Sequence, residues 1–242
     1  MNTHRVENLP IVLVPGYWLG GWAWDDVVER LRADGCPAVP VTLPGLESPA
    51  APRAGIRLGD HVDAVRAALD AAHGPVVLVA HSGAGAIASA VLDVAAHQVA
   101  RVVYVDSGPV ADGNVPRPDL PSEAAELPMP SFPDLEADGG SLEGLDDAVR
   151  RQFRERAVAH PAGPLREPIA LPHGLGVAVP TTVVCCSFPS QAVRSLVASG
   201  EPMFSALADL SDVTYVDLPT GHWPMWSRPD ALADLLAGLA RG

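Results

Sequence analysis

The chain has little cysteine and no long apolar run among its 242 residues. Two of its three cysteines, Cys185 and Cys186, are adjacent in a segment typical of a buried strand, so they do not form a disulfide framework. No apolar stretch approaches the ~20 residues that a membrane-spanning helix requires. Residues 1–8 show neither the apolar region nor the Ala-x-Ala cleavage site of a signal peptide. We therefore expect a cytoplasmic protein that binds no membrane.

Positive charge is also scarce. Lys and Arg together number 16 against 29 Asp and Glu, which gives a formal net charge of −13. Nucleic acids and anionic membrane surfaces bind basic patches, so we expect neither as a partner. No His, Asp and Glu spacing typical of a metal site is present, and we expect no metal and no cofactor. The expected partner is a small-molecule substrate, and a homodimer is left open.

Helical and strand patterns alternate along the chain. Hydrophobic residues make up 48% and charged residues 19%, which is typical of a globular domain. The alternation predicts an α/β fold with a mostly parallel, doubly wound sheet. The expected strands are 10–14, 38–43, 76–80, 99–106, 180–186 and 213–218, and the expected helices are 24–34, 59–72 and the stretch after Ser82 to about His97.

Ser82 stands where a buried strand is expected to meet a helix. The apolar run 75–80 is preceded by glycine, and the stretch after the serine is rich in alanine without β-branched runs. Ala80 and Ala84 flank the serine at two positions, where a sharp turn tolerates only small residues. This pattern predicts a nucleophile elbow, whose following helix points its N-terminal amides at the site. An ordinary small-residue turn is the alternative.

His222 follows the last expected strand. It lies in Thr-Gly-His-Trp-Pro, on a loop at the C-terminal end of 213–218. Active sites of open α/β sheets lie at that edge. We therefore predict that His222 is the general base that takes the proton of Ser82. A surface-loop histidine without a role is the alternative, and His81 is expected to pack or hydrogen-bond locally.

A second tight turn, at Gly16, follows the first expected strand. It can present the backbone N–H of Tyr17 beside that of Gly83. Two such donors form an oxyanion hole for charge that develops in the transition state. Trp18, next to this turn, either faces the substrate or packs between helix and sheet, and it is our candidate substrate-binding residue.

These residues together resemble the α/β-hydrolase family over about residues 9–110 and 178–240. The stretch from Val12 to Trp24 is similar to the oxyanion strand and helix start of plant methylesterases, hydroxynitrile lyases and small bacterial esterases. Pro15 replaces the histidine usual in that turn. The chain order serine, acid, histidine is the one that the family uses. The resemblance implies the α/β-hydrolase fold.

Residues 110–178 differ in composition from the rest of the chain. They carry many prolines, acidic clusters and an amphipathic segment at 145–158. About 70 residues without structure would be unusual in a compact domain, although a long surface loop is the alternative. Relatives insert a helical cap at this point, so the resemblance implies a core of 1–109 and 179–242 and a cap of 110–178. A cap excludes water and shapes the pocket.

The acid of the triad departs from the usual family pattern. In most relatives it follows the strand before the last, but no carboxylate follows 180–186 until Glu201. Asp106 is the better candidate, because some members of the fold carry the acid one strand earlier. A carboxylate that caps the following Ser-Gly-Pro turn is the alternative role for Asp106. Glu201, Asp209 and Asp217 remain as candidates for the acid.

The predicted function is that of a serine hydrolase. It would cleave a small ester, thioester or lactone through an acyl-enzyme on Ser82, with His222 as general base. A lyase or a cyclase of natural-product metabolism on the same scaffold is the first alternative, with His222 as general acid and base. A ligand receptor that hardly turns over is the second. Fold alone does not fix function.

Overall fold

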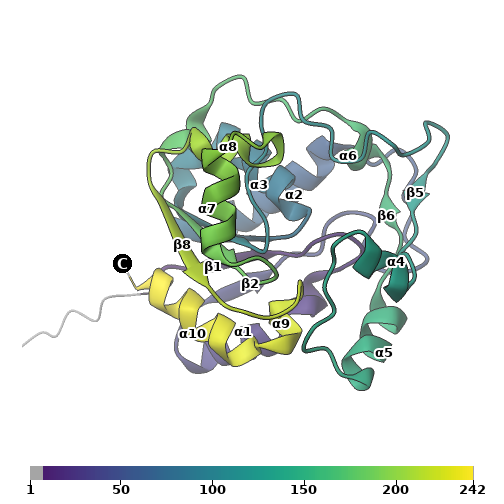
Figure 1. The fold of residues 1–242 in the computed structure, drawn as a ribbon, viewed down its shortest axis with the longest axis horizontal. Coiled ribbons are helices and arrows are strands. Elements are labelled where there is room, and N and C mark those ends of the chain that lie inside the picture. The colour runs from purple at the N-terminus through teal and green to yellow at the C-terminus, as the bar shows by residue number, and fades with distance from the viewer. Residues whose placement is uncertain (1–7, 242) are drawn as a thin grey trace, which may run out of the picture.

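In the computed structural model, which describes residues 8–241, six parallel strands form one sheet (Figure 1). The sheet order is β2-β1-β3-β4-β7-β8. The predicted α/β class with a mostly parallel sheet is confirmed. The strand bounds are β1 Ile11–Val14, β2 Ala38–Pro40, β3 Val76–His81, β4 Val99–Val105, β7 Thr181–Cys185 and β8 Val213–Asp217.

One strand is shorter than predicted. The pattern predicts a strand to residue 43, whereas β2 ends at Pro40. This strand lies at the edge of the sheet, and past Pro40 its contact with β1 is continued by the hydrogen bond from the N–H of Val41 to the carbonyl of Leu13. The residues for which a signal peptide was discounted fall almost wholly within 1–7, outside the described residues.

Ten α-helices are found in the described part of the chain. The predicted helices near 24–34, 59–72 and after Ser82 are confirmed as α1, α2 and α3. The bounds are α1 Asp25–Ala33, α2 Leu58–Ala71, α3 Ala84–Ala95, α4 Phe132–Ala137, α5 Asp147–Arg156, α6 Gly163–Arg166, α7 Ser190–Ala198, α8 Ser205–Ala208, α9 Pro224–Ser227 and α10 Pro229–Ala240. Four 3₁₀ helices accompany them, η1 Gly21–Trp24, η2 Ala96–Gln98, η3 Leu175–Ala178 and η4 Pro202–Phe204.

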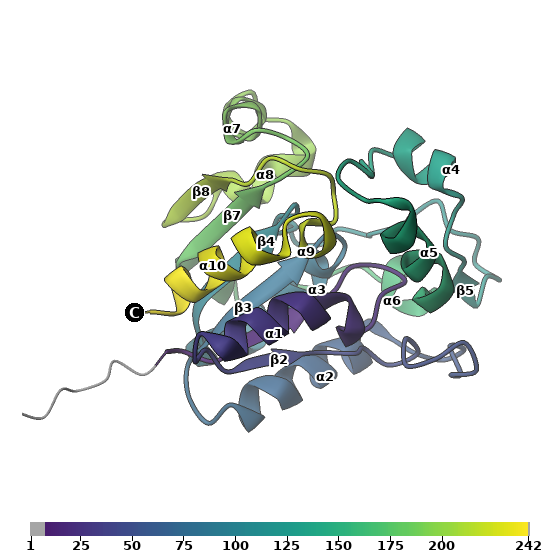
Figure 2. The ribbon, with the colours of Figure 1, turned by 90° about the horizontal axis from the view of Figure 1, so that it is seen from below.

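The strands send alternate side chains into two apolar cores. In β3, Val77 and Val79 pack in one core, and Val76, Leu78 and Ala80 pack in the other. Helices α1 and α10 cover the first face, side by side in Figure 2, and α2 and α3 cover the second. Burial on both faces explains why these strands are continuous apolar runs rather than alternating ones.

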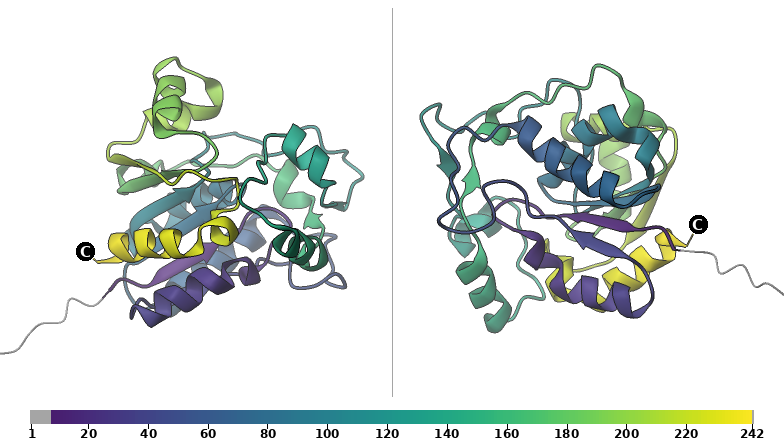
Figure 3. Two further views of the ribbon diagram at one scale, coloured as in Figure 1. Left: turned by 60° about the horizontal axis from the view of Figure 1, so that its bottom comes forward. Right: turned by 180° about the vertical axis from the view of Figure 1, so that it is seen from behind.

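The segment between β4 and β7 gathers at one edge of the sheet. It contains α4, α5, α6 and a short antiparallel pair of strands, β5 Glu126–Leu127 and β6 His160–Pro161. Both views in Figure 3 show α4 and α5 away from the C-terminal end of the chain, beside the edge at which the central strands finish. The segment is therefore placed against the edge where Ser82 and His222 lie.

The three cysteines are buried and unpaired. Burial raises the pKa of Cys185 to about 11 and also raises the pKa of Cys36 and Cys186. The thiols therefore stay protonated at neutral pH. Among residues 8–241, no helix combines the length and apolar character needed to cross a bilayer.

Candidate active site

Ser82 sits in a strained turn between β3 and α3. Its φ is +54°, in the left-handed region that non-glycine residues avoid, at a cost of roughly 1–2 kcal/mol. The turn is tightly packed, since a Cβ added at Gly16 would lie 2.9 Å from Ser82 Cβ, and one at Gly85 would overlap the carbonyl of Gly108. Glycines at these two positions therefore allow the backbone to close around the serine, as an elbow requires.

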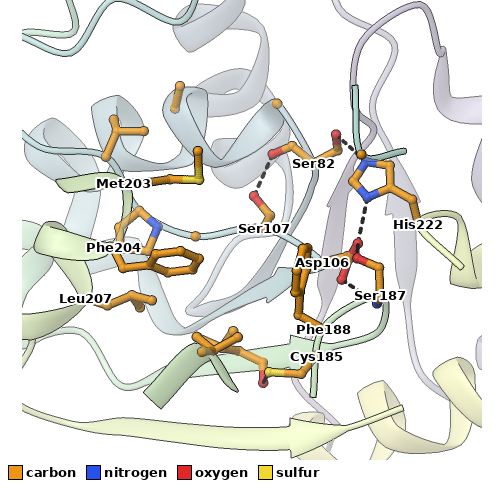
Figure 4. Close-up of a pocket in the computed structure, with 18 of the residues that line it drawn as sticks. Ser82, Asp106, Ser107, Cys185, Ser187, Phe188, Met203, Phe204, Leu207 and His222 are labelled. Carbon is orange, nitrogen blue, oxygen red and sulfur yellow. Dashed lines mark hydrogen bonds and ion pairs between the residues drawn. The ribbon is translucent and has the colours of Figure 1, made fainter. Parts of the chain in front are cut away.

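Ser82, His222 and Asp106 form one hydrogen-bonded chain. Nε2 of His222 lies 2.8 Å from Oγ of Ser82, and Nδ1 of His222 lies 2.6 Å from Oδ2 of Asp106 (Figure 4). The three side chains lie just past the C-terminal ends of β3, β8 and β4. The structure thus brings together all three residues of the predicted triad, although they are far apart in sequence.

The other candidate acids do not reach the histidine. Asp217 accepts hydrogen bonds from the backbone N–H and the hydroxyl of Ser190, at 2.6 and 2.7 Å, and so caps the start of α7. Within residues 8–241, neither Glu201 nor Asp209 makes a hydrogen bond to His222.

Asp106 is held ionised in a nearly closed setting. Its side chain is 8% exposed, and it accepts hydrogen bonds from His222, from the N–H groups of Cys186 and Ser187, and from the Ser187 hydroxyl at 2.6 Å. Burial raises the pKa of this carboxyl, but the hydrogen bonds from His222 and Ser187 outweigh it, so the pKa lies below its ordinary value. A carboxylate here fixes the proton of His222 on Nδ1 and leaves Nε2 free to accept one from Ser82.

Sequence reasoning did not find Ser187. Ser187 lies just past the end of β7 and therefore at the same sheet edge as Asp106, which follows β4. The signal that could have found Ser187 is the pairing of β4 with β7, because residues that follow two neighbouring parallel strands lie close together.

His81 supports the backbone of His222 and is not a second base. Its Nε2 lies 2.7 Å from the carbonyl oxygen of His222, and because a carbonyl only accepts, this nitrogen carries the proton. Burial, and next the charge of His222, lower the pKa of His81 to about 3. The two rings lie 5.0 Å apart. The predicted local role for His81 fits these contacts.

The turn after β1 lies directly on the elbow. A Cβ at Gly83 would overlap the ring of Tyr17, so the two residues are in contact. Within residues 8–241, no protein acceptor pairs with the backbone N–H of either residue. Both amides are therefore unpaired donors in the residues next to or in contact with the elbow.

Two cavities meet at Ser82, and we name them the main cavity and the side cavity. The main cavity has a volume of about 470 Å³ and is mostly apolar. Met203, Phe204 and Leu207 face the triad across it (Figure 4). The side cavity, of about 260 Å³, includes Trp18 among its walls. Sequence reasoning missed the main-cavity wall, because its members lie on short elements that carry no motif.

Trp18 lies beside the side cavity in a constrained position. Its φ is +66°, its side chain is 8% exposed, and its ring N–H donates to the carbonyl of Leu127 at 3.0 Å. The carbonyl of Trp18 accepts from the N–H of Val158. Trp18 therefore both lines the side cavity and joins the oxyanion turn to the segment 110–178.

The residues described hold no cluster of three or more side chains that could bind a metal ion.

Comparison with known sequences identifies the family. The sequence model described as "Alpha/beta hydrolase family" matches residues 11–235, almost the whole chain. The chain belongs to the alpha/beta hydrolase family. The predicted resemblance is thereby confirmed.

Solved structures of other alpha/beta hydrolases share the fold at low sequence identity. An extracellular hydrolase from a Paenibacillus species, described as similar to tobacco salicylic acid binding protein 2, has a TM-score of 0.73 at 18% identity, with 95% of this chain and 98% of that chain covered. A methylesterase from Arabidopsis has a TM-score of 0.71 at 19% identity, with coverage of 96% and 98%. A pyrethroid hydrolase from Sphingobium faniae has 0.68 at 21% identity, with coverage of 96% and 97%. A search of curated protein sequences finds no match.

Proposed function

We propose that this hydrolase is a serine enzyme that cleaves a small ester, thioester or lactone through an acyl-enzyme on Ser82. The observation that carries the proposal is the hydrogen-bonded chain from Oγ of Ser82 through His222 to Asp106. A serine hydroxyl is a weak nucleophile unless a base takes its proton, and this chain supplies the base and its orienting acid.

The reaction then runs in two halves. Oγ of Ser82 bonds to the acyl carbon while Nε2 of His222 takes its proton, and the oxyanion rests against the N–H groups of Tyr17 and Gly83. His222 returns the proton to the leaving alcohol or thiol as its bond to the acyl carbon breaks. A water, deprotonated by His222, repeats the attack and releases the acid. No cofactor enters either half.

The cavities suggest how a substrate is divided. The apolar main cavity suits a bulky hydrocarbon part, and the smaller side cavity suits the other part. The segment 110–178 supplies walls to both through Gly139, and its Ser141 carbonyl accepts from the N–H of His222 at 2.8 Å. These contacts support the proposal that the segment is a cap over the site.

Labelling with a fluorophosphonate tests the proposal. The reagent bonds covalently to an activated serine, so intact-mass analysis should show one adduct on the wild-type protein and none on Ser82→Ala. Ser195→Ala, which removes an exposed hydroxyl on α7, is the matched control and should label like the wild type. A folded wild-type protein without an adduct would overturn the proposal and favour lyase or cyclase chemistry.

A further inference from the structure

A third cavity lies next to the main cavity, beyond the segment that follows β4. Its volume is about 210 Å³, and we name it the far cavity. Pro109 and Val110 line both the main and the far cavity. These two residues therefore stand between the two spaces.

The two cavities run along the same elements. Helix α3 contributes Ala86 to the main cavity and Ser89 to the far cavity, and strand β7 contributes Val183 and Thr181 in the same order. Leu207 of α8 lines the main cavity, and Leu210, just after that helix, lines the far cavity. The main and far cavities are thus consecutive parts of one groove on the α3 face of the sheet. The segment 107–110 crosses that groove.

The crossing segment is fixed firmly to α3. Oγ of Ser107 donates to the carbonyl of Ser82 at 2.5 Å, and the N–H of Val110 donates to Oγ of Ser89 at 3.1 Å. Backbone contact at Gly108 fixes the segment between these bonds. The backbone is therefore a permanent wall, and the part of the wall that a mutation can shorten is the side chain of Val110.

The side chain of Val110 packs between the two spaces. It joins an apolar cluster with Ala86, Ala90 and Ile169, to which Leu171 also belongs. Ala86 lines the main cavity and Leu171 lines the far cavity, so the cluster that Val110 joins spans the division. Truncation to alanine removes two methyl groups from this partition.

The lining of the far cavity indicates what it would accept. Two of its buried polar side chains already have partners: Asp93 accepts from the N–H groups of His173 and Gly174, and the hydroxyl of Ser89 donates to the carbonyl of Gly85. The remaining walls include Leu92, Leu171 and Leu210 among other apolar side chains. Most of this lining is apolar, so a hydrocarbon chain gains by leaving water there, whereas an anionic group would meet the carboxylates of Asp93 and Asp209.

We propose that Val110 is a specificity-determining residue that limits the length of an unbranched alkyl chain in the substrate. This alkyl chain extends from Ser82 into the main cavity and stops at the side chain of Val110. Without that side chain, the alkyl chain continues into the far cavity. The inference rests on the proposed function, because the alkyl chain belongs to the ester that Ser82 attacks. The chain belongs either to the acyl group or to the alcohol.

Two substrate series distinguish these sources. One is p-nitrophenyl alkanoates with acyl chains of increasing length, and the other is acetates of increasingly long n-alkyl alcohols. In wild type, kcat/KM should fall sharply beyond a limiting length in one series. In Val110→Ala the limit should move to longer chains in that series, with a rise of about tenfold in the ratio of long-chain to short-chain kcat/KM. Val110→Leu should move it the other way.

The controls separate the partition from general loosening. Val94→Ala makes the same truncation on the exposed side of α3 and should keep the wild-type profile. Val110→Ala combined with Ala206→Phe, which fills the far cavity, should restore the wild-type limit. Folded Val110→Ala and Val110→Leu proteins with wild-type profiles in both series would overturn the role of Val110 alone. A wild-type protein that hydrolyses neither series and takes no fluorophosphonate would overturn the proposed function along with it.

Discussion

Asp106 combines two features that rarely occur together, a left-handed backbone and an ionised buried side chain. Its φ is +43°, and the turn aims its carboxylate both at His222 and at the backbone N–H groups after β7. Such strain persists only where surrounding contacts hold it. The four hydrogen bonds that Asp106 accepts are those contacts.

Asp106→Asn should cripple turnover while the protein stays folded. The amide cannot hold the Nδ1 proton of His222 as a carboxylate does, so the wrong tautomer faces Ser82, and kcat should fall by about ten-thousandfold. Steady-state kinetics on a p-nitrophenyl ester measures this. Glu201→Gln removes a carboxylate that does not reach His222 and should leave kcat unchanged. The reverse result, with only Glu201→Gln impaired, would move the acid to Glu201.

His81→Leu tests whether the imidazole positions His222. The carbonyl of His222 would lose the donor 2.7 Å away, so we expect a fall of about 1–3 kcal/mol in the free energy of unfolding. We also expect about a tenfold fall in kcat with little change in KM, because the histidine loop is displaced but the cavities are not. His81→Gln, which can still donate, should recover part of kcat. Equal kcat for the Leu and Gln variants would show that His81 only fills space.

At the scale of elements, the contact between the β1 turn and the start of α3 would position the two proposed oxyanion donors, the N–H groups of Tyr17 and Gly83. Gly83→Ala would place a methyl group against the ring of Tyr17 and push the turn away. Misplacement of one donor should lower kcat by about 10²- to 10³-fold. Gly59→Ala, where nothing lies within 4 Å of the new carbon, is the matched control. It should keep full activity and gain up to about 1 kcal/mol of stability in α2. Normal turnover in a folded Gly83→Ala protein would show that the N–H of Tyr17 is not an oxyanion donor.

The sequence predicts the core elements well because burial on both faces leaves an unambiguous pattern. β3 and α3 come from a continuous apolar run and an alanine-rich run, and their junction at Ser82 follows from them. Side chains on short elements are harder to place from the sequence. Phe204 and Leu207 enter the main cavity from η4 and α8, which are too short to show any periodicity. Their place depends on tertiary packing that no local pattern encodes.

At the scale of the whole molecule, three buried histidines make stability depend on pH. Burial lowers the pKa of His61, lowers that of His81 to about 3, and lowers that of His160 well below its ordinary value. Both ring nitrogens of His160 lack a hydrogen-bond partner among the described residues. The folded state keeps these rings neutral, whereas the unfolded chain protonates them near the ordinary pKa of about 6.5.

Stability should therefore fall as the pH drops below about 6.5, since the unfolded state then binds more protons. Between pH 7 and 5.5 His81 and His160 should each cost about 1 kcal/mol of the free energy of unfolding, and His61 should add to the loss in the same direction. Urea unfolding across this range measures the loss. Asp106 contributes at lower pH. Its pKa is lower in the folded protein than in the unfolded chain, so its stabilising effect is lost as the pH falls below the pKa of the unfolded carboxyl.

His160→Leu should flatten this dependence by about 1 kcal/mol between pH 7 and 5.5, because one strongly shifted buried ring is gone. His97→Leu removes an exposed histidine and should leave the slope as it is. A slope unchanged in His160→Leu would mean that the acid sensitivity has another origin.

The buried thiols give the molecule a use in spectroscopy. Because Cys36, Cys185 and Cys186 are buried and keep their protons, maleimides find no ready nucleophile on the native protein. Met203, which is 80% exposed at the rim of the main cavity, is a place where one new cysteine would stand alone in reactivity. A fluorophore or spin label attached there would report substrate entry from a single known position, without removal of any native residue from the core.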